Sequence, residues 1–217
     1  MSAGNVKGLV KVLLVDDHAV VRNGIRLMLD TVDDIEVAGE AATAHDALLA
    51  TQAQHYDVVL VDINLPDKSG LELIKRLRTQ GTKAAVVVLS AYPEEMYALR
   101  AFKQGAAAYL NKRSSADEII AAVRKAAAGG KYVSPEVMER FAGMMGGETI
   151  RGHEALSDRE LEVLKHLAAG ESLVRIGELL HLSPSTVTTY RARLLEKMGM
   201  KSNAELTRYA LEHGLLV

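Results

Sequence analysis

Five short apolar runs, each followed by a longer helical pattern, constrain the fold of this chain more than any other feature. The middle runs are almost wholly apolar and lack the alternation of a strand with one wet face. Strands covered by helices on both faces of a parallel sheet have this pattern. The runs are residues 10–15, 35–40, 58–61, 85–89 and 107–110, and the helical patterns are residues 19–30, 44–53, 70–79, 94–104 and 116–128. They predict an α/β doubly wound domain with a five-stranded parallel sheet over residues 8–129.

The pattern changes after residue 129. Ser134 and Pro135 predict the start of a short helix that ends near Met145, and Gly146 and Gly147 follow it. We interpret residues 130–153 as a linker with one helix. No strand pattern appears from residue 154 onward. Helical patterns at residues 157–169, 172–180, 184–198 and 202–213 predict an all-α four-helix domain over residues 154–217.

The composition excludes several classes of protein. The chain of 217 residues has 26 Lys and Arg against 28 Asp and Glu, a net charge of −2, and no cysteine. Disulfides, thiolate zinc sites and cysteine nucleophiles are therefore absent, and no strong overall positive charge attracts nucleic acid or membrane. No apolar run approaches the ~20 residues of a membrane span, and residues 1–11 have no secretory apolar core. We expect a soluble cytoplasmic protein.

Polar side chains follow four of the predicted strands, at the edge where doubly wound sheets bind ligands. Asp16 and Asp17 come after the first run, Asp62 after the third, Ser90 after the fourth and Lys112 after the fifth. Clustered carboxylates repel one another unless a cation neutralises them, and a set of oxygen ligands favours Mg²⁺. A carboxylate beside Mg²⁺ can attack a phosphoryl group, whose oxygens an ammonium and a hydroxyl can hold. The sequence therefore predicts a phosphoryl-transfer site.

His18 directly follows the acidic pair. It could act as a base or as a metal ligand. We favour the simpler interpretation, in which His18 is a residue at the start of a helix near the edge of the site.

Four segments carry a resemblance to a known family: Val-Asp-Asp-His (15–18), Val-Asp-Ile-Asn-Leu-Pro-Asp-Lys-Ser-Gly (61–70), Leu-Ser-Ala (89–91) and Tyr-Leu-Asn-Lys (109–112). They resemble the flavodoxin-like receiver domain of response regulators. The resemblance implies that a sensor histidine kinase phosphorylates Asp62. It also implies that Asp16 and Asp17 form an acidic pocket, and that Mg²⁺ binds Asp17, Asp62 and the backbone carbonyl of Asn64.

The same resemblance implies a switch. Ser90 is the switch hydroxyl, Tyr109 the switch aromatic residue, and Lys112 the lysine that binds the phosphoryl group. After phosphorylation, Ser90 would move toward Asp62 and Tyr109 would rotate into the space that Ser90 leaves. Ala108 departs from the family, which commonly has glycine before the switch aromatic residue.

The second half of the chain contains a helix-turn-helix pattern around residues 181–183, where a short turn makes two helices cross steeply. The second of these helices has a face that is predicted to be buried, formed by Val187, Tyr190, Leu194 and Met198. Another face has short side chains that can approach base edges, with basic residues beside it for phosphates. The short residues are Ser185, Thr188, Thr189 and Ala192, and the basic residues are Arg191, Arg193, Lys197 and Lys201.

A helical bundle without a DNA partner is the alternative for this half. Residues 154–217 contain eight Lys and Arg and nine Asp and Glu, a net charge of −1. A strong nonspecific DNA binder would be more basic. Four of the eight basic residues nevertheless lie within residues 191–201. This concentration favours DNA binding with modest affinity.

Residues 156–164 (Leu-Ser-Asp-Arg-Glu-Leu-Glu-Val-Leu) and 185–191 (Ser-Thr-Val-Thr-Thr-Tyr-Arg) are similar to the LuxR-type DNA-binding domain of NarL/FixJ regulators. The resemblance implies double-stranded DNA as a partner and a homodimer in which residues 203–213 make contact. It implies a phosphorylation-gated, sequence-specific bacterial transcription regulator. Such a protein is not an enzyme, because it accepts one phosphoryl group and hydrolyses it slowly. The chain departs from the family at Leu173, Arg175 and Gly177.

The sequence also bears on three other functions. A Mg²⁺-dependent phosphohydrolase needs an acid two residues after its nucleophile, but Asn64 stands there. A nucleotide or flavin module needs a glycine-rich loop after the first strand, and none follows Val15. A regulator that acts without phosphorylation is disfavoured by the complete set of pocket residues, but the sequence leaves this alternative open.

Overall fold

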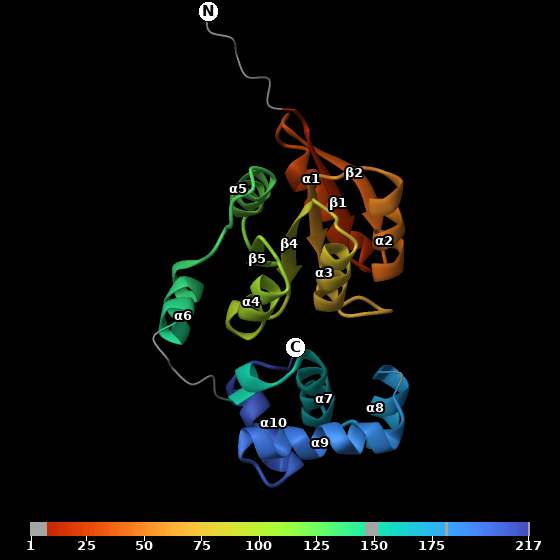
Figure 1. Ribbon diagram of the computed structural model, residues 1–217, viewed down its shortest axis with the longest axis vertical. Helices are drawn as coiled ribbons and strands as arrows, with labels where there is room; N and C mark the ends of the chain where they lie inside the picture. Colours follow the sequence, from red (N-terminus) through yellow and green to blue (C-terminus); the bar gives the residue numbers. More distant parts are fainter. Residues whose placement is uncertain (1–7, 146–151, 181, 217) are drawn as a thin grey trace, which may run out of the picture. The chain divides into compact units, whose positions relative to one another are not determined.

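The computed structural model describes residues 8–145, 152–180 and 182–216. The chain divides into two compact units between Met138 and Glu139. Figure 1 shows the helices and strands of both units.

A parallel sheet forms the centre of the first unit. The strands are β1 (Val10–Val15), β2 (Ile35–Ala41), β3 (Val58–Val61), β4 (Ala85–Ser90) and β5 (Ala108–Asn111). They lie in the order β2-β1-β3-β4-β5, and each pairing between neighbours is parallel. The predicted doubly wound α/β fold is confirmed. The strand order changes direction next to β1 and β3, so the loops after these two strands border the place where such sheets bind ligands.

Helices cover the sheet in two groups. They are α1 (Ala19–Leu29), α2 (Ala44–Ala53), α3 (Gly70–Thr79), α4 (Glu94–Lys103) and α5 (Ala116–Ala127). Helix α1 contacts α5, whereas α3 contacts both α2 and α4. One core cluster joins Leu14, Leu60 and Leu89 of the strands to Ile25 of α1 and Ile119 of α5. All four residues of β3 are buried, which explains why the central strands lack a polar alternation.

Strands β1 and β3 have the predicted bounds, and the ends of the other three differ from the predicted ones by one residue, within the usual uncertainty of such boundaries. Strand β2 continues to Ala41 because this residue pairs with Val15. Strand β5 begins and ends one residue later than predicted because Asn111 pairs with Ser90. Helix α6 (Pro135–Met145) lies where the sequence predicts the short linker helix. Gly146 and Gly147 of the predicted linker lie outside the described residues.

Among the residues that the structure describes, the second unit consists of helices joined by short turns. It contains a short 3-10 helix, η1 (Gly152–Ala155), followed by α7 (Asp158–Ala168), α8 (Leu173–Leu180), α9 (Pro184–Met198) and α10 (Asn203–Glu212). Ser157 and Glu160 form the predicted capping box at the start of α7. Helix α9 begins at the predicted Pro184 and ends against Gly199, whose φ of 66° is left-handed.

Gly177 of α8 has a packing role that its departure from the family did not reveal. Its carbonyl accepts a hydrogen bond from the backbone N–H of Leu182 (2.8 Å). A Cβ atom at position 177 would lie 2.7 Å from the carbonyl oxygen of Leu182. Glycine in a helix costs ~1 kcal/mol relative to alanine, but here its small size allows the chain to turn closely from α8 into α9. Residue 181 of the predicted turn lies outside the described residues.

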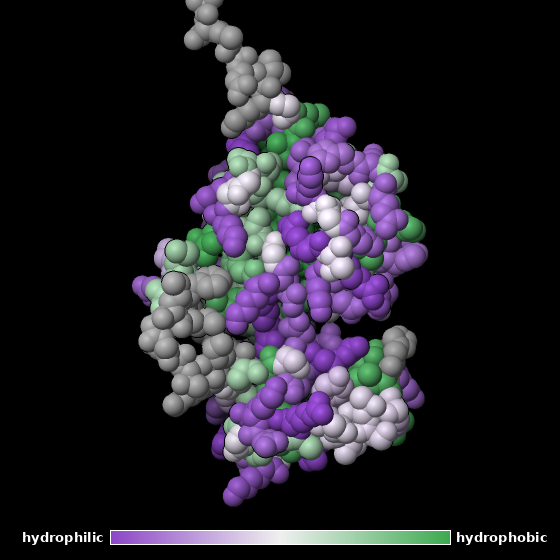
Figure 2. Space-filling model, in the orientation of Figure 1, coloured by the Kyte–Doolittle hydropathy of each residue, from purple (hydrophilic) through white to green (hydrophobic). Residues whose placement is uncertain are grey.

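The surface of the chain is mixed. Hydrophilic residues cover most of the face in Figure 2, and hydrophobic ones form small separate groups. Among the larger apolar side chains that are exposed are Val20 and Leu27 of α1, Leu49 of α2 and Leu211 of α10. None of the helices in the described ranges has the length and apolar character to cross a membrane.

Candidate functional site

The predicted site residues of the first unit meet at the carboxyl edge of the sheet. Asp16 follows β1, Asp62 follows β3, Ser90 is the last residue of β4, and Lys112 follows β5. Asp16, Asp62 and Ser90 are buried, with 3%, 4% and 1% of their surfaces exposed. Because β1, β3, β4 and β5 are neighbours in the sheet, their ends bring these side chains together as the sequence predicted.

Lys112 joins the two buried carboxylates. Its Nζ lies 2.6 Å from Oδ2 of Asp16 and 2.7 Å from Oδ2 of Asp62. Burial raises the pKa of Asp62 above its ordinary value, although Lys112 acts in the opposite direction. Burial alone would lower the pKa of Lys112, but Asp16 and Asp62 hold it above its ordinary value. The site therefore contains a charged lysine shared by two acids that repel each other.

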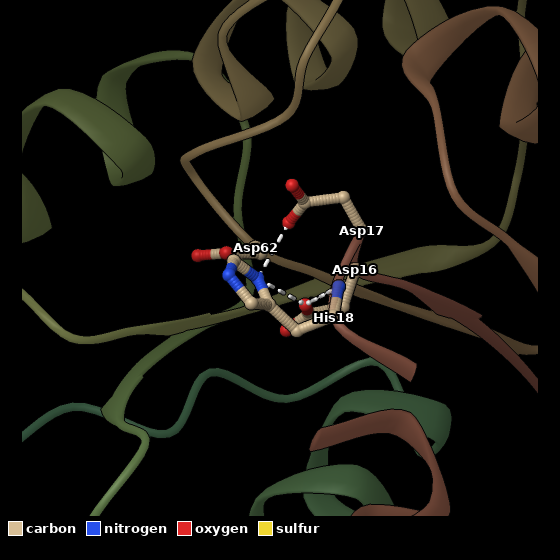
Figure 3. A group of neighbouring side chains, drawn as sticks. All are labelled: Asp16, Asp17, His18 and Asp62. Atoms are coloured by element: carbon tan, nitrogen blue, oxygen red, sulfur yellow. Dashed lines mark hydrogen bonds and ion pairs between the residues drawn. The ribbon is translucent and has the colours of Figure 1, made fainter. Parts of the chain in front are cut away.

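Asp17 and His18 lie at the open side of this site. The Asp17 side chain is 34% exposed, and its Oδ1 lies 2.7 Å from Nδ1 of His18. The same nitrogen lies 3.4 Å from Oδ1 of Asp16 (Figure 3). His18 is the N-cap residue of α1, as the sequence indicated. The sequence did not indicate that its ring would reach the carboxylates.

These side chains fit a divalent cation. One ligand atom from each of Asp16, Asp17, His18 and Asp62 lies within 4.8 Å of the other three. Three of the four donors are carboxylates, which are the ligands of hard cations such as Mg²⁺. Lys112 supplies one positive charge to three carboxylates, so a cation would relieve the remaining repulsion.

Ser90 and Tyr109 are both buried beside the loop after β4. The Oγ of Ser90 accepts a hydrogen bond from the backbone N–H of Tyr92 (3.2 Å), and the Tyr109 hydroxyl donates to the carbonyl of Tyr92 (3.0 Å). Tyr109 is 2% exposed. The ring of Tyr109 is thus already buried before phosphorylation, and its rotation into the space that Ser90 leaves stays a prediction. Burial raises the pKa of the Tyr109 phenol, which keeps it a donor.

The loop after Asp62 is held by contacts that the sequence pattern did not reveal. The Asp67 carboxylate accepts hydrogen bonds from the backbone N–H groups of Ala44 (2.9 Å) and His45 (3.0 Å) at the start of α2. Burial alone would raise the pKa of Asp67, but these amide donors hold it below its ordinary value. The Asn64 side chain donates to the Tyr92 hydroxyl (3.3 Å). Residues in two other segments, the start of α2 and the loop after β4, therefore fix this loop.

Gly70 closes the loop at its other end. Its N–H donates to the carbonyl of Ile63 (2.8 Å), and Asn64 and Ser69 form an antiparallel bridge. A Cβ atom at position 70 would overlap the carbonyl oxygen of Asp62. Helix α3 therefore starts directly against the backbone of Asp62, and a side chain at its first residue would displace this aspartate.

In the second unit, the predicted faces of α9 are separated. Val187 and Leu194 are fully buried, while Tyr190 and Met198 are half-buried. The side chains that were predicted to face DNA are exposed, except for the half-buried Arg191. The exposed ones are Ser185, Thr188, Thr189, Ala192, Arg193 and Lys197.

Two of the basic residues on α9 have partners within this unit. Arg191 donates from Nε to Oδ1 of Asn203 (2.7 Å). Lys197 lies 2.7 Å from Oε2 of Glu160, the buried residue of the capping box of α7. These contacts position α9 on its neighbours. Sequence spacing did not indicate them, because both partners lie on other helices.

Comparison with known families follows the same division of the chain. Residues 12–124 match the family described as "Response regulator receiver domain". The chain belongs to the response-regulator family. Residues 154–210 match "Bacterial regulatory proteins, luxR family", so this response regulator has a LuxR-type DNA-binding domain after its receiver domain.

Relatives of this response regulator share both parts. The transcriptional regulatory protein MctR of Rhizobium johnstonii is 38% identical over 207 residues, which cover 95% of each chain. The response regulator UvrY of Escherichia coli (strain K12) is 33% identical over 209 residues, which cover 95% of this chain and 96% of UvrY. A crystal structure of the response regulator ChrA from a heme-sensing two-component system is 32% identical with a TM-score of 0.54, and the match covers 96% of this chain and 100% of ChrA.

Proposed function

We propose that Asp62 accepts a phosphoryl group from a sensor histidine kinase and that this modification controls DNA binding by the second domain. The observation that carries the proposal is the contact of Lys112 with the buried Asp62 at the end of β3, 2.7 Å from Nζ to Oδ2. An ammonium in this position can neutralise the oxygens of a phosphoryl group on Asp62.

The transfer uses groups that already lie together. A carboxylate oxygen of Asp62 attacks phosphorus, the bond from phosphorus to the donor nitrogen breaks, and the departing imidazole keeps the electron pair. Mg²⁺, held by Asp17, Asp62 and the Asn64 carbonyl, would supply charge neutralisation. The Ser90 hydroxyl accepts from Tyr92 and can donate its own proton to the phosphoryl group. The chain acts stoichiometrically, with slow hydrolysis, and is not an enzyme in the usual sense.

The route from Asp62 to the rest of the domain passes through Tyr92. Its backbone N–H binds Ser90, its carbonyl binds Tyr109, and its hydroxyl binds Asn64. A shift of Ser90 toward a phosphoryl group would therefore alter a connected set of hydrogen bonds. Shifting the domain from 1:99 to 99:1 between two states requires ~5.5 kcal/mol of differential stabilisation. The charge and the three acceptor oxygens of the phosphoryl group must supply this free energy.

The experiment for Asp62 uses a small phosphodonor with Mg²⁺ and intact-protein mass. Wild type gains one phosphoryl group, and Asp62→Asn gains none. Asp33→Asn is the control, because Asp33 is an exposed acid of the same domain that lies outside the site. Equal gain in wild type and Asp62→Asn would place the acceptor elsewhere. No gain in wild type would refute phosphorylation as the switch.

The second domain would bind double-stranded DNA through α9. The Thr188 hydroxyl donates to the carbonyl of Pro184 (2.9 Å) and that of Thr189 to Ser185 (3.1 Å). Both hydroxyls are thus engaged as donors within the helix, while their methyl groups and oxygen lone pairs stay available to base edges. Arg193 is exposed and suits a phosphate.

Substitutions in α9 test this assignment by binding titration over a range of salt concentrations. Thr188→Ala or Thr189→Ala should change the preferred sequence. Arg193→Ala should weaken binding to all sequences and lower the salt slope by about 0.9, the contribution of one phosphate contact. If all three variants bind like wild type, α9 does not contact DNA in this way.

DNA binding as a homodimer would use α10, as the family resemblance implies. Binding of DNA also supports a location in the bacterial cytoplasm.

A further inference from the structure

His18 contacts the acidic pocket through both its backbone and its ring. Its backbone N–H donates to Oδ1 of Asp16 (2.8 Å), which fixes where the residue stands. Its Nδ1 lies 2.7 Å from Oδ1 of Asp17 and 3.4 Å from Oδ1 of Asp16. Figure 3 shows the imidazole ring among the carboxylates of the pocket. The side chain is 65% exposed, so it can turn toward a ligand without leaving a packed core.

The spacing of the four donors is close to that of ligands on one ion. They lie within 4.8 Å of one another, whereas two ligands on opposite sides of a zinc-sized ion stand roughly 4 Å apart. Lys112 contacts Oδ2 of Asp16, so Oδ1 of this carboxylate remains on the side of His18. Only a small contraction would bring Nδ1 of His18 and the carboxylates around the same cation.

The chemistry of the donors separates two groups of cation. Mg²⁺ prefers oxygen ligands and water, and an imidazole nitrogen adds little to its binding. Ni²⁺ and Zn²⁺ bind imidazole well. We propose that His18 is a metal ligand that gives this pocket a high affinity for first-row transition-metal ions, while Mg²⁺ binds without it. The proposal rests on the proposed divalent-cation site at Asp62.

The test measures the affinities of the full-length protein for Ni²⁺ and for Mg²⁺ by isothermal titration calorimetry. His18→Ala should weaken Ni²⁺ binding by at least about tenfold and change Mg²⁺ binding by less than about twofold. His55→Ala is a matched control, because His55 is 72% exposed and its Nε2 lies 3.2 Å from one carboxylate, that of Asp57. This control should bind both ions like wild type.

Further measurements separate the possible failures. Asp62→Asn should weaken the binding of both Ni²⁺ and Mg²⁺, which would assign the measured site to this pocket. Equal weakening of both ions in His18→Ala would show that His18 only positions Asp17, and unchanged Ni²⁺ affinity with normal Mg²⁺ binding would refute this inference alone. Absence of any Mg²⁺ or Ni²⁺ binding in wild type would refute the divalent-cation site itself.

A spectroscopic signature tests direct ligation. The imidazole proton resonances of His18, identified by their loss in His18→Ala, should shift much more when Zn²⁺ is added than when Mg²⁺ is added. Resonances that ignore Zn²⁺ would overturn the assignment of His18 as a ligand.

Discussion

Asp62 is held in a position that is unfavourable for an ionised carboxylate. Burial raises its pKa, the nearby Asp16 acts in the same direction, and Lys112 compensates only in part. An acid with a raised pKa stabilises the fold most when it is protonated. The contribution of Asp62 to stability is therefore highest below pH 3.8, the ordinary pKa of aspartate, and it falls as the pH rises through the folded-state pKa.

Asp62→Asn should consequently stabilise the protein at neutral pH. We expect a gain of about 1 kcal/mol in the free energy of unfolding, because a partly compensated buried charge is removed. Urea denaturation at pH 7 with a chelator measures it, and the gain should vanish as the pH approaches 3.8. Asp33→Asn is the control. A loss of stability at pH 7 would mean that the contact with Lys112 outweighs the cost of burial.

The sequence was enough to predict which residues form the acidic site, but not the side-chain contacts that hold the loop beside it. Asp16, Asp62 and Lys112 follow predicted strands, and parallel strands bring their carboxyl ends to one edge. The contacts of Asp67 with the start of α2 were not predictable, because its partners Ala44 and His45 are more than twenty residues away. Side-chain contacts between distant segments leave no periodic signal in a sequence.

Helices α7 and α9 are joined by one buried carboxylate. Oε2 of Glu160 accepts from the N–H of Ser157 (2.7 Å) and from Nζ of Lys197 (2.7 Å). Burial alone would raise the pKa of Glu160, but Lys197 and Ser157 hold it below the ordinary value of 4.5. Its stabilising contribution is therefore present above pH 4.5 and is lost as the pH falls through the lower folded-state pKa.

Glu160→Gln should lower the free energy of unfolding at pH 7 by about 1 kcal/mol or less, because glutamine keeps the capping acceptor but loses the charge, and Lys197 is partly exposed. Thermal unfolding at a series of pH values measures this. The difference from wild type should disappear in acid. Glu162→Gln is a matched control on the same helix, where the ion pair with Arg159 joins no second helix. Equal losses in the two variants would contradict a special role for Glu160.

The bounds of the helices and strands could be predicted from the sequence. The contacts between different helices could not. The apolar run of β3 and the capping box of α7 have local sequence signals, and both lie where those signals indicate. The contact between Glu160 and Lys197 joins two helices through residues that lie 37 positions apart in the sequence. Lys197 was predicted to bind phosphate from its place on α9 alone, and its partner in the fold was not foreseen.

At the scale of the whole molecule, the proposed dimer needs an apolar contact. Leu206 and Ala210 of α10 are fully buried in the core, whereas Leu211 is 65% exposed. Leu211→Asp should leave phosphorylation unchanged and weaken the binding of a two-half-site DNA by about tenfold, because a hot-spot contact contributes more than 1 kcal/mol. Titration with phosphorylated protein measures this.

Leu49→Asp is the control for Leu211→Asp, because it changes an exposed leucine of the other domain. Dimer formation of both variants should be followed by light scattering in the presence of DNA. Wild-type affinity of Leu211→Asp for DNA would exclude this face of α10 as the contact.

The closure of the loop by Gly70 against Asp62 has a consequence for how this domain can vary. Exposed loops ordinarily tolerate insertions, but here the bridge from Asn64 to Ser69 sets a fixed span between the acceptor and α3. Pro66 is exposed, so its side chain constrains this span less than the number of residues does. An insertion or deletion of one residue in this loop would move the aspartate away from its lysine. The length of the loop therefore matters more here than the identity of its side chains.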